Sequence, residues 1–309
     1  MTGSVSLASI ITLCAALGGG SALADSKGPA MQGLWVMNAK ESMWPAIMKG
    51  TGPGGAPFEH SMHVRDDGTA LAITDVLKHS EDDTAISIWD GAWDGKEHKS
   101  SDGSAMAFQR VDATRFKDRW SNAKGDTGED TCSFSERGMK LTCRGSTTPK
   151  GGTRASYVEV LDRIPSRLTV TAADGKEYTS MQGLWVENFE ESNFGARGTP
   201  FKYHAQEVTM DDGKTLTFSD VIVRTDGKAS KHTWSSSWEV PGNWPNGYVM
   251  TYQHLEHNLI RDHWVSPNGV NGGDTCSFSD GGRKMRCYGY NQPPGGKWND
   301  LLEVSDRVD

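Results

Sequence analysis

The chain has 309 residues, a net charge of −8 and an apolar content of 36%. Its length is sufficient for two domains with cores of their own. The acidic balance argues against a nucleic-acid-binding protein, which needs a basic face to contact phosphates, and against attachment to anionic lipid surfaces. The 36 glycines and 11 tryptophans favour short aromatic strands joined by many turns over a helix bundle.

Residues 1–24 are predicted to be an export signal. Leu7 to Leu17 form a short apolar run, and Ala22-Leu23-Ala24 before Asp25 is a natural site for signal peptidase. No Lys or Arg precedes the run, which departs from the usual basic start of such signals. The run is too short to span a membrane. We therefore expect a periplasmic or secreted protein without a membrane span.

The rest of the chain consists of two similar halves. The stretch Met31-Gln32-Gly33-Leu34-Trp35-Val36 returns as Met181-Gln182-Gly183-Leu184-Trp185-Val186. Further pairs follow in the same order: Asp66-Asp67-Gly68 with Asp211-Asp212-Gly213, Trp89 and Trp93 with Trp234 and Trp238, Trp120 with Trp264, and 130–135 with 274–279. A self-match of this length predicts two whole domains of one fold. We expect the first repeat over 25–164, a connector over 165–180 and the second repeat over 181–309.

Four cysteines remain once the predicted signal is removed. Cys132 and Cys143 bracket a stretch of the same length as that between Cys276 and Cys287. Four cysteines allow three pairings, and the identical spacing favours one disulfide in each repeat, across a hairpin. Disulfides favour an oxidising compartment over the cytoplasm. A zinc site is the alternative, but it would need short Cys-x-x-Cys pairs, which the sequence lacks.

Within each repeat the pattern is that of an antiparallel meander. Alternating runs such as 69–74 and 215–220 are typical of half-buried strands. We expect roughly eight to ten short strands per repeat, enough to close a barrel, with a β-sandwich as the alternative. The one predicted helix covers 39–48, where Pro45 limits its length. Asp-Gly pairs are candidate hairpin turns at Asp67, Asp90, Asp94, Asp102, Asp212 and Asp226.

Gly33-Leu34-Trp35 and Gly183-Leu184-Trp185, each opening a predicted meander, resemble the Gly-x-Trp signature of lipocalins and the wider calycin barrels. In that family the tryptophan closes one barrel end and packs against a late arginine, for which Arg163 and Arg307 are the candidates. The segment 35–42 also resembles the opening of bacterial secreted proteins. The Thr-Asp-Tyr motif and the long helix of true lipocalins are missing. The resemblance therefore implies two tandem calycin-like barrels, with a small, largely apolar ligand held inside one repeat or the other.

The candidate ligand-binding residues are tryptophans that both repeats share. They could line an apolar cavity or, if exposed, form a stacking platform for a sugar, and packing in the core is the alternative. Trp44 and Trp244 lie in predicted loops, where the specificity of a barrel mouth would arise. The shared set comprises Trp35, Trp89, Trp93, Trp120, Trp185, Trp234, Trp238 and Trp264.

Catalytic and metal sites receive weaker support. Two carboxylates across a cleft could hydrolyse a glycosidic bond, and Asp118 and Asp262 are the candidate catalysts. His254, His257 and His263 crowd one region, but strand spacing puts the first two on opposite faces, so no metal site is predicted. Gly50-x-Gly52-x-x-Gly55 matches the dinucleotide pattern only in letters, because Pro53 interrupts it and no strand and helix flank it. The phosphate-loop, hydrolase, metalloprotease and calcium motifs are absent, so no cofactor is predicted.

The sequence thus predicts an exported, two-domain binding protein for a small apolar molecule. A carbohydrate- or envelope-binding module with exposed tryptophans is the alternative. A secreted enzyme, either an isomerase or a glycan hydrolase with an aspartate catalyst, is the third hypothesis.

Overall fold

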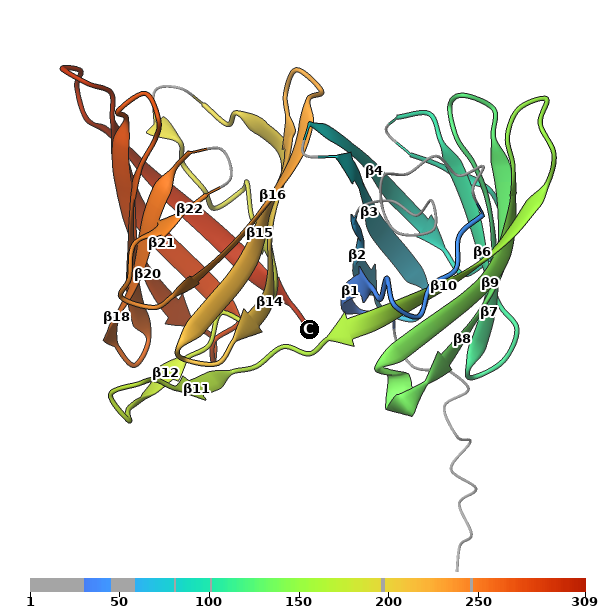
Figure 1. Cartoon of the computed structure of the whole chain (residues 1–309), viewed down its shortest axis with the longest axis horizontal. Coiled ribbons are helices and arrows are strands. Elements are labelled where there is room, and N and C mark those ends of the chain that lie inside the picture. Colours follow the sequence, from blue (N-terminus) through green and yellow to red (C-terminus); the bar gives the residue numbers. More distant parts are fainter. Residues whose placement is uncertain (1–30, 46–58, 81, 101, 196–197, 245–246) are drawn as a thin grey trace, which may run out of the picture.

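The computed structural model describes residues 31–45, 59–80, 82–100, 102–195, 198–244 and 247–309, so the predicted signal over 1–24 lies outside the described residues. Two sheets of ten antiparallel strands each curl into a nearly closed barrel, as Figure 1 shows. The all-β fold with two tandem meander barrels is thereby confirmed, and the sandwich alternative is wrong.

The first barrel follows the strand order β4-β3-β2-β1-β10-β9-β8-β7-β6-β5, with the edge strands β4 and β5 side by side. Its strands are β1 (Gly33–Met37), β2 (Glu59–Asp66), β3 (Ala70–Ser80), β4 (Asp83–Ala92), β5 (His98–Lys99), β6 (Ala105–Arg110), β7 (Arg115–Ser121), β8 (Thr127–Ser135), β9 (Lys140–Thr148) and β10 (Ala155–Ile164).

The second barrel repeats this order as β16-β15-β14-β13-β22-β21-β20-β19-β18-β17. Its strands are β13 (Gly183–Glu187), β14 (Phe201–Asp211), β15 (Thr215–Arg224), β16 (Ala229–Ser237), β17 (Gly242–Asn243), β18 (Val249–Glu256), β19 (Leu259–Val265), β20 (Asn271–Ser279), β21 (Lys284–Gln292) and β22 (Asn299–Val308). Between the barrels, β11 (Thr169–Thr171) and β12 (Glu177–Thr179) form a separate two-stranded hairpin.

Two local predictions are wrong. The described part of the helix predicted over 39–48 is a turn, because the side chain of Asn38 accepts hydrogen bonds from the backbone N–H groups of Lys40 (3.2 Å) and Glu41 (3.3 Å) and so competes with helix formation. The pair Asp90-Gly91 is not a turn either, since β4 continues through it opposite Leu71 and Ala72.

The disulfide prediction is confirmed. Cys132 pairs with Cys143 between β8 and β9, and Cys276 pairs with Cys287 between β20 and β21. Each pair occupies directly opposite positions of its hairpin, and all four side chains are buried in the barrel cores. Each disulfide therefore cross-links two neighbouring strands of the barrel wall beside the core.

The repeated tryptophan is buried in the core of each barrel. The indole N–H groups of Trp35 and Trp185, both completely buried, donate to the backbone oxygens of Met31 and Met181 at 2.7 Å. The guanidinium group of Arg163 lies 5.8 Å from the ring centre of Trp35, and the Trp185 ring has the equivalent arginine at 4.3 Å. These are the tryptophan–arginine contacts that the calycin resemblance implies.

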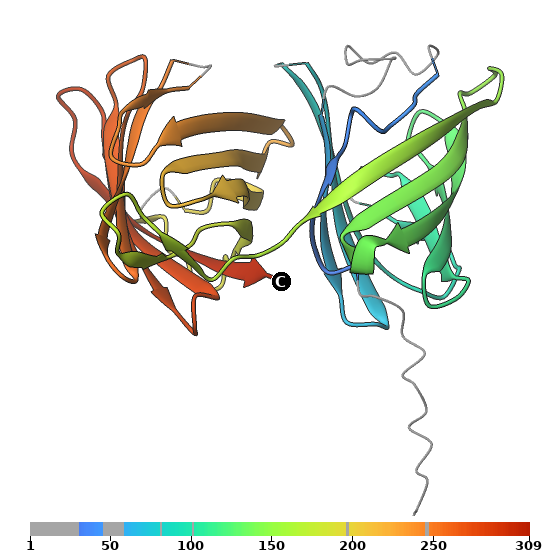
Figure 2. The same cartoon turned by 60° about the horizontal axis from the view of Figure 1, so that its bottom comes forward.

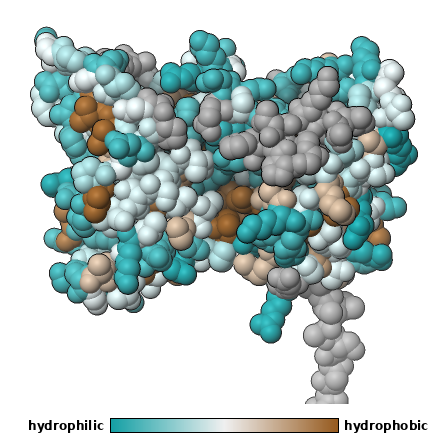
Figure 3. Space-filling model, viewed as in Figure 1, coloured by the Kyte–Doolittle hydropathy of each residue, from teal (hydrophilic) through white to brown (hydrophobic). Residues whose placement is uncertain are grey.

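The barrels touch along the outer faces of β1, β2 and β4 on one side and β13 to β16 on the other (Figure 2). At the centre of this contact Glu207, only 1% exposed, accepts hydrogen bonds from Ser61 (2.5 Å) and His63 (2.7 Å) of the first barrel. Lys231 pairs with the same carboxylate at 2.8 Å. Figure 3 shows apolar residues gathered at the junction beside mostly polar surroundings. A buried charged network thus joins the two barrels.

Candidate functional site

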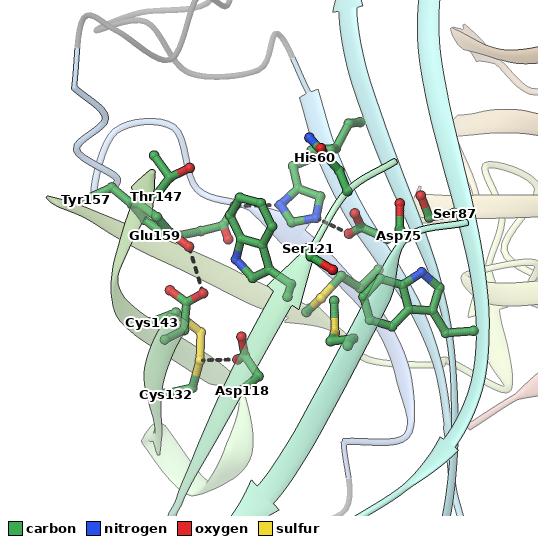
Figure 4. Close-up of a pocket in the computed structure, with 18 of the residues that line it drawn as sticks. His60, Asp75, Ser87, Asp118, Ser121, Cys132, Cys143, Thr147, Tyr157 and Glu159 are labelled. Atoms are coloured by element: carbon green, nitrogen blue, oxygen red, sulfur yellow. Dashed lines mark hydrogen bonds and ion pairs between the residues drawn. A yellow bond between two sulfur atoms is a disulfide. The ribbon is translucent and has the colours of Figure 1, made fainter. Parts of the chain in front are cut away.

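A cavity of about 670 Å³ lies inside the first barrel (Figure 4). Alternate residues of a strand point to the same side, so β2, β3, β4 and β6 to β10 each contribute every second side chain to its wall. Its volume falls within the range of about 300–1,000 Å³ that small-molecule sites occupy. The apolar part of the wall comprises Met62, Leu77, Trp89, Met106, Phe108 and Trp120, among others.

A buried histidine is clamped between two carboxylates on one wall of this cavity. His60 Nδ1 lies 2.5 Å from Glu159 Oε1, and Nε2 lies 2.6 Å from Asp75 Oδ1. Burial alone would lower the pKa of His60, but the two carboxylates raise it well above the usual value. The imidazole is therefore protonated, and both of its N–H groups are engaged.

Two aspartates face each other beside this clamp. Asp118 on β7 and Asp130 on β8 are direct cross-strand neighbours, both buried, and the hydroxyl of Tyr157 donates to Asp130 Oδ2 at 2.7 Å. Burial raises the pKa of Asp130 to about 6. Burial, followed by the neighbouring Asp130, raises the pKa of Asp118 well above its usual value. The pair thus retains a proton near neutral pH.

Glycines inside the strands make room for these side chains. A Cβ atom on Gly145 would lie 1.8 Å from Asp130 Oδ1, and one on Gly289 would lie 1.6 Å from Asp274 Oδ1 in the second barrel. Sequence reasoning missed these positions, although a glycine inside a strand pattern signals the close approach of another group. Two further glycines face tryptophan rings in the same way, Gly128 against Trp120 and Gly272 against Trp264.

The second barrel contains a similar polar layer, although Glu187 and not Glu303, the counterpart of Glu159, contacts its histidine. His204 lies 2.7 Å from Asp220 and 3.3 Å from Glu187, and Asp262 faces Asp274 across β19 and β20. Burial likewise raises the pKa of Asp262 well above its usual value. The layer is therefore a property of the repeated fold and does not by itself distinguish a ligand site.

The two barrels differ in what fills the space next to this layer. In the second barrel Trp244 lies 5.9 Å from Phe218, 6.4 Å from Trp234 and 6.0 Å from Tyr248, measured between ring centres. The strand registers show which residues of the two barrels correspond. Ser100 corresponds to Trp244, Ser104 to Tyr248, Ser87 to His232 and Phe108 to Tyr252. Of these serines, Ser87 and Ser104 line the cavity of the first barrel, at positions where the second barrel has the larger rings of His232 and Tyr248.

None of the eight shared tryptophans is exposed. Trp89 and Trp120 line the cavity, whereas Trp35 and Trp93 belong to the core of the first barrel. Trp93 donates to Asp66 at 3.0 Å. Trp89 is only 6% exposed, and its indole N–H has no hydrogen-bond partner among the residues that the structure describes. The corresponding residues Trp185, Trp234, Trp238 and Trp264 pack inside the second barrel or in its wall.

The sequence prediction included Asp118 but missed His60, Glu159 and Tyr157, which the fold brings to the same cavity. A usable signal existed for two of them, since His60 and Glu159 recur as His204 and Glu303 in the second repeat. The catalytic candidate Asp262 lies in the second barrel, far along the chain from Asp118, and the two do not share a cavity wall.

The histidines of the second repeat are placed apart. His254 stacks on Trp238 with ring centres 3.7 Å apart, and His257 contacts the backbone oxygen of Glu177 at 3.0 Å. His263 contacts the side chain of Asn271 at 2.7 Å. Within the described ranges no group of three or more His, Cys, Asp or Glu side chains is arranged to hold a metal ion.

Replacing Asp118 with Asn is expected to stabilise the protein by about 1–3 kcal/mol at pH 8. Because the pKa of Asp118 is raised on folding, its carboxyl contributes stability that is complete below about pH 3.9 and is lost as the pH rises through the folded value. Urea unfolding at several pH values measures this, and the gain should shrink towards pH 4.

The matched control is Asp112→Asn in an exposed turn, where the Arg115 hydrogen bond lowers the pKa of Asp112 to about 2. This substitution should give no gain at pH 8. An Asp118→Asn variant that is less stable than wild type at pH 8 would contradict the buried acid pair.

The chain matches no family model and no curated protein sequence. Among solved structures, similarity is found to a protein of unknown function of the DUF3598 family from Nostoc punctiforme, with 10% identity, a TM-score of 0.31, and coverage of 90% of this chain and 94% of that chain. A putative outer membrane protein from Bacteroides fragilis has 8% identity, a TM-score of 0.22, and coverage of 91% and 97%.

Transferrin binding protein B from Haemophilus parasuis has 8% identity, a TM-score of 0.21, and coverage of 92% and 76%. Similarities at this level carry no conclusion about what the chain binds. Separately, no helix long and apolar enough to cross a membrane is found in the described part of the chain.

Proposed function

We propose that the protein is an exported binding protein whose first barrel holds one small, largely apolar molecule. The observation that carries this proposal is the difference between the barrels: serines leave a cavity of about 670 Å³ in the first, whereas Trp244 and Tyr248 pack into the equivalent space of the second. A mostly apolar cavity of this size, with the N–H of Trp89 in its wall unpaired among the described residues, has the properties of a ligand site.

The proposed location follows from the cysteines and the first residues. Disulfides persist in oxidising compartments, so the two hairpin disulfides support a place outside the cytoplasm. The proposed removal of residues 1–24 by signal peptidase is consistent with that place, and we propose 25–164 and 181–309 as the two domains of the mature chain.

Titration with Nile red, an uncharged apolar dye with a carbonyl acceptor, tests the binding proposal. We expect saturable binding of one dye per chain. Trp89→Phe should weaken this binding about 3- to 10-fold, because an aromatic ring is kept at this position but the indole N–H donor is lost. Trp234→Phe makes the same change in the second barrel and serves as the control. Absence of saturable binding, or equal weakening in the two variants, would contradict the proposal.

A catalytic role for Asp118 is the second candidate, since a carboxyl whose pKa is raised inside a cavity is what a general acid requires. Burial also raises the pKa of Asp262 in the second barrel, so the raised pKa of Asp118 by itself gives the enzyme hypothesis little support. Loss of a measured turnover in Asp118→Asn, with binding retained, would favour the enzyme. The glycan alternative has no support at the eight shared tryptophans, because none of them is exposed.

A further inference from the structure

The cavity of the first barrel has a marked excess of acidic groups. Five carboxyl groups line it, and the cationic or titratable bases that face it are His60, His79 and Lys124. Lys124 lies in the exposed turn between β7 and β8, beside Asp126. Tyr157 is the other titratable group of the wall. The carboxyl groups are Asp75, Asp118, Asp126, Asp130 and Glu159.

The buried cation does not offset this excess towards a ligand. Both ring nitrogens of His60 are already paired, with Asp75 at 2.6 Å and with Glu159 at 2.5 Å. The histidine therefore has no donor left for an anionic ligand, and the clamp as a whole has a net negative charge. An anion entering the cavity would meet carboxylates, and the unpaired N–H of Trp89 is a neutral donor that brings no positive charge to offset the repulsion.

The Asp118–Asp130 pair is the least satisfied part of this layer. Asp118 is 8% exposed, and its contact with Cys132 Sγ at 3.6 Å supplies no donor because that sulfur is in a disulfide. In the second barrel the equivalent Asp262 accepts a backbone hydrogen bond from Asp274 at 3.2 Å. Among the described residues Asp118 has no such N–H donor and relies on the proton that it shares with Asp130.

The neighbouring wall also differs between the barrels. Phe108 lies directly across from Asp118, whereas Tyr252 lies directly across from Asp262. An apolar ring therefore borders the acid pair in the first barrel, in the wall that also contains Met106 and Trp120. The buried N–H of Trp89, without a partner in the described part of the chain, is a second and independent group that lines this cavity unpaired.

We infer that the ligand of the first barrel is an apolar amine, whose ammonium group lies against the Asp118–Asp130 pair while its hydrocarbon part fills the space between Trp89, Met106, Phe108 and Trp120. This inference rests on the proposed ligand-binding function and names the class of ligand. The ammonium group supplies the N–H donors that Asp118 lacks and takes the place of the shared proton, which leaves to solvent when the amine binds. Charge is conserved, because one proton is released for each ammonium group bound.

Proton release gives the inference a pH signature. Burial raises the pKa of Asp130 to about 6, so the empty acid pair is more fully protonated as the pH falls. Affinity for an amine should therefore increase as the pH rises from about 5 to about 7.5, while affinity for a neutral ligand of the same length should stay nearly constant. Glu159 and Asp75 raise the pKa of His60 well above its usual value, so we expect His60 to add little to the change.

Competition against Nile red on the full mature chain tests the inference, with octylamine, 1-octanol and octanoate as ligands of equal chain length. At about pH 7.5 we expect octylamine to bind at least about 10-fold more tightly than octanol, and octanoate to compete least. Asp118→Asn should remove most of the preference for octylamine while octanol binding changes by less than about 2-fold. Asp262→Asn, the same change in the second barrel, should alter neither.

The outcomes separate the two proposals. If none of the three ligands and no dye binds to the wild type, the proposed function itself fails. If octanol binds and octylamine binds no better, or if Asp118→Asn leaves the preference for octylamine intact, only the amine inference fails. Asp118→Asn is expected to be at least as stable as wild type, and its retained octanol binding shows that its cavity is intact.

Discussion

The double substitution Ser100→Trp and Ser104→Tyr is expected to abolish ligand binding to the first barrel. It places there the side chains that Trp244 and Tyr248 contribute to the second barrel, where Trp244 lies 6.4 Å from Trp234. Ser104 lines the cavity, and the backbone N–H of Ser100 donates to the backbone oxygen of Ser104 just as that of Trp244 donates to Tyr248. A core of this density leaves no room for a ligand, so we expect an affinity loss of at least about 100-fold, or about 2.7 kcal/mol.

Nile red titration measures this loss, and Lys99→Tyr is the matched control. Lys99 precedes Ser100 and is exposed, so the control adds a ring to the same strand end without filling the cavity. Its binding should match that of wild type. If the double variant folds and still binds the dye with wild-type affinity, the ligand site is not in this cavity.

Replacing Glu207 with Ala is expected to destabilise the protein by about 3–5 kcal/mol. The substitution leaves the buried ammonium group of Lys231 without its carboxylate partner at 2.8 Å and removes the acceptor of Ser61 and His63. Burial would raise the pKa of Glu207, but Lys231 and His63 lower it overall. Its stabilising contribution is therefore present above about pH 4.3 and is lost as the pH falls.

Thermal and urea unfolding at about pH 7 measure this loss. Glu239→Ala is the control, since Glu239 is exposed and does not contact the network. The double variant Glu207→Leu/Lys231→Met removes both charges at once and should be more stable than Glu207→Ala. A Glu207→Ala variant with wild-type stability would show that this network does not hold the barrels together.

The repeated residues of the sequence predicted the fold correctly. They predicted two meander barrels with one disulfide inside each. The evidence was two copies of Gly-Leu-Trp, two equal cysteine spacings and alternating runs, and the alternation depends only on the local period of a strand. The predictions at Asp90-Gly91 and at 39–48 failed because cross-strand pairing and the Asn38 side chain override local propensity.

The cavity could not be predicted from the shared residues. The sequence comparison selected what the repeats have in common, such as Trp89 and Asp118, whereas the cavity depends on where they differ, as at Ser87 and Ser104. In the His60 clamp, Asp75 lies on the neighbouring strand β3, but Glu159 on β10 reaches His60 because β1 pairs with both β2 and β10. Volume and long-range pairing are not visible in a linear pattern.

Native mass spectrometry of the mature protein purified from its own host tests the central claim most directly. The account predicts one bound molecule per chain that is lost on denaturation, and no bound molecule in Ser100→Trp/Ser104→Tyr purified in the same way. Two bound molecules per chain, or an equal bound mass in that double variant, would contradict a single site in the first barrel.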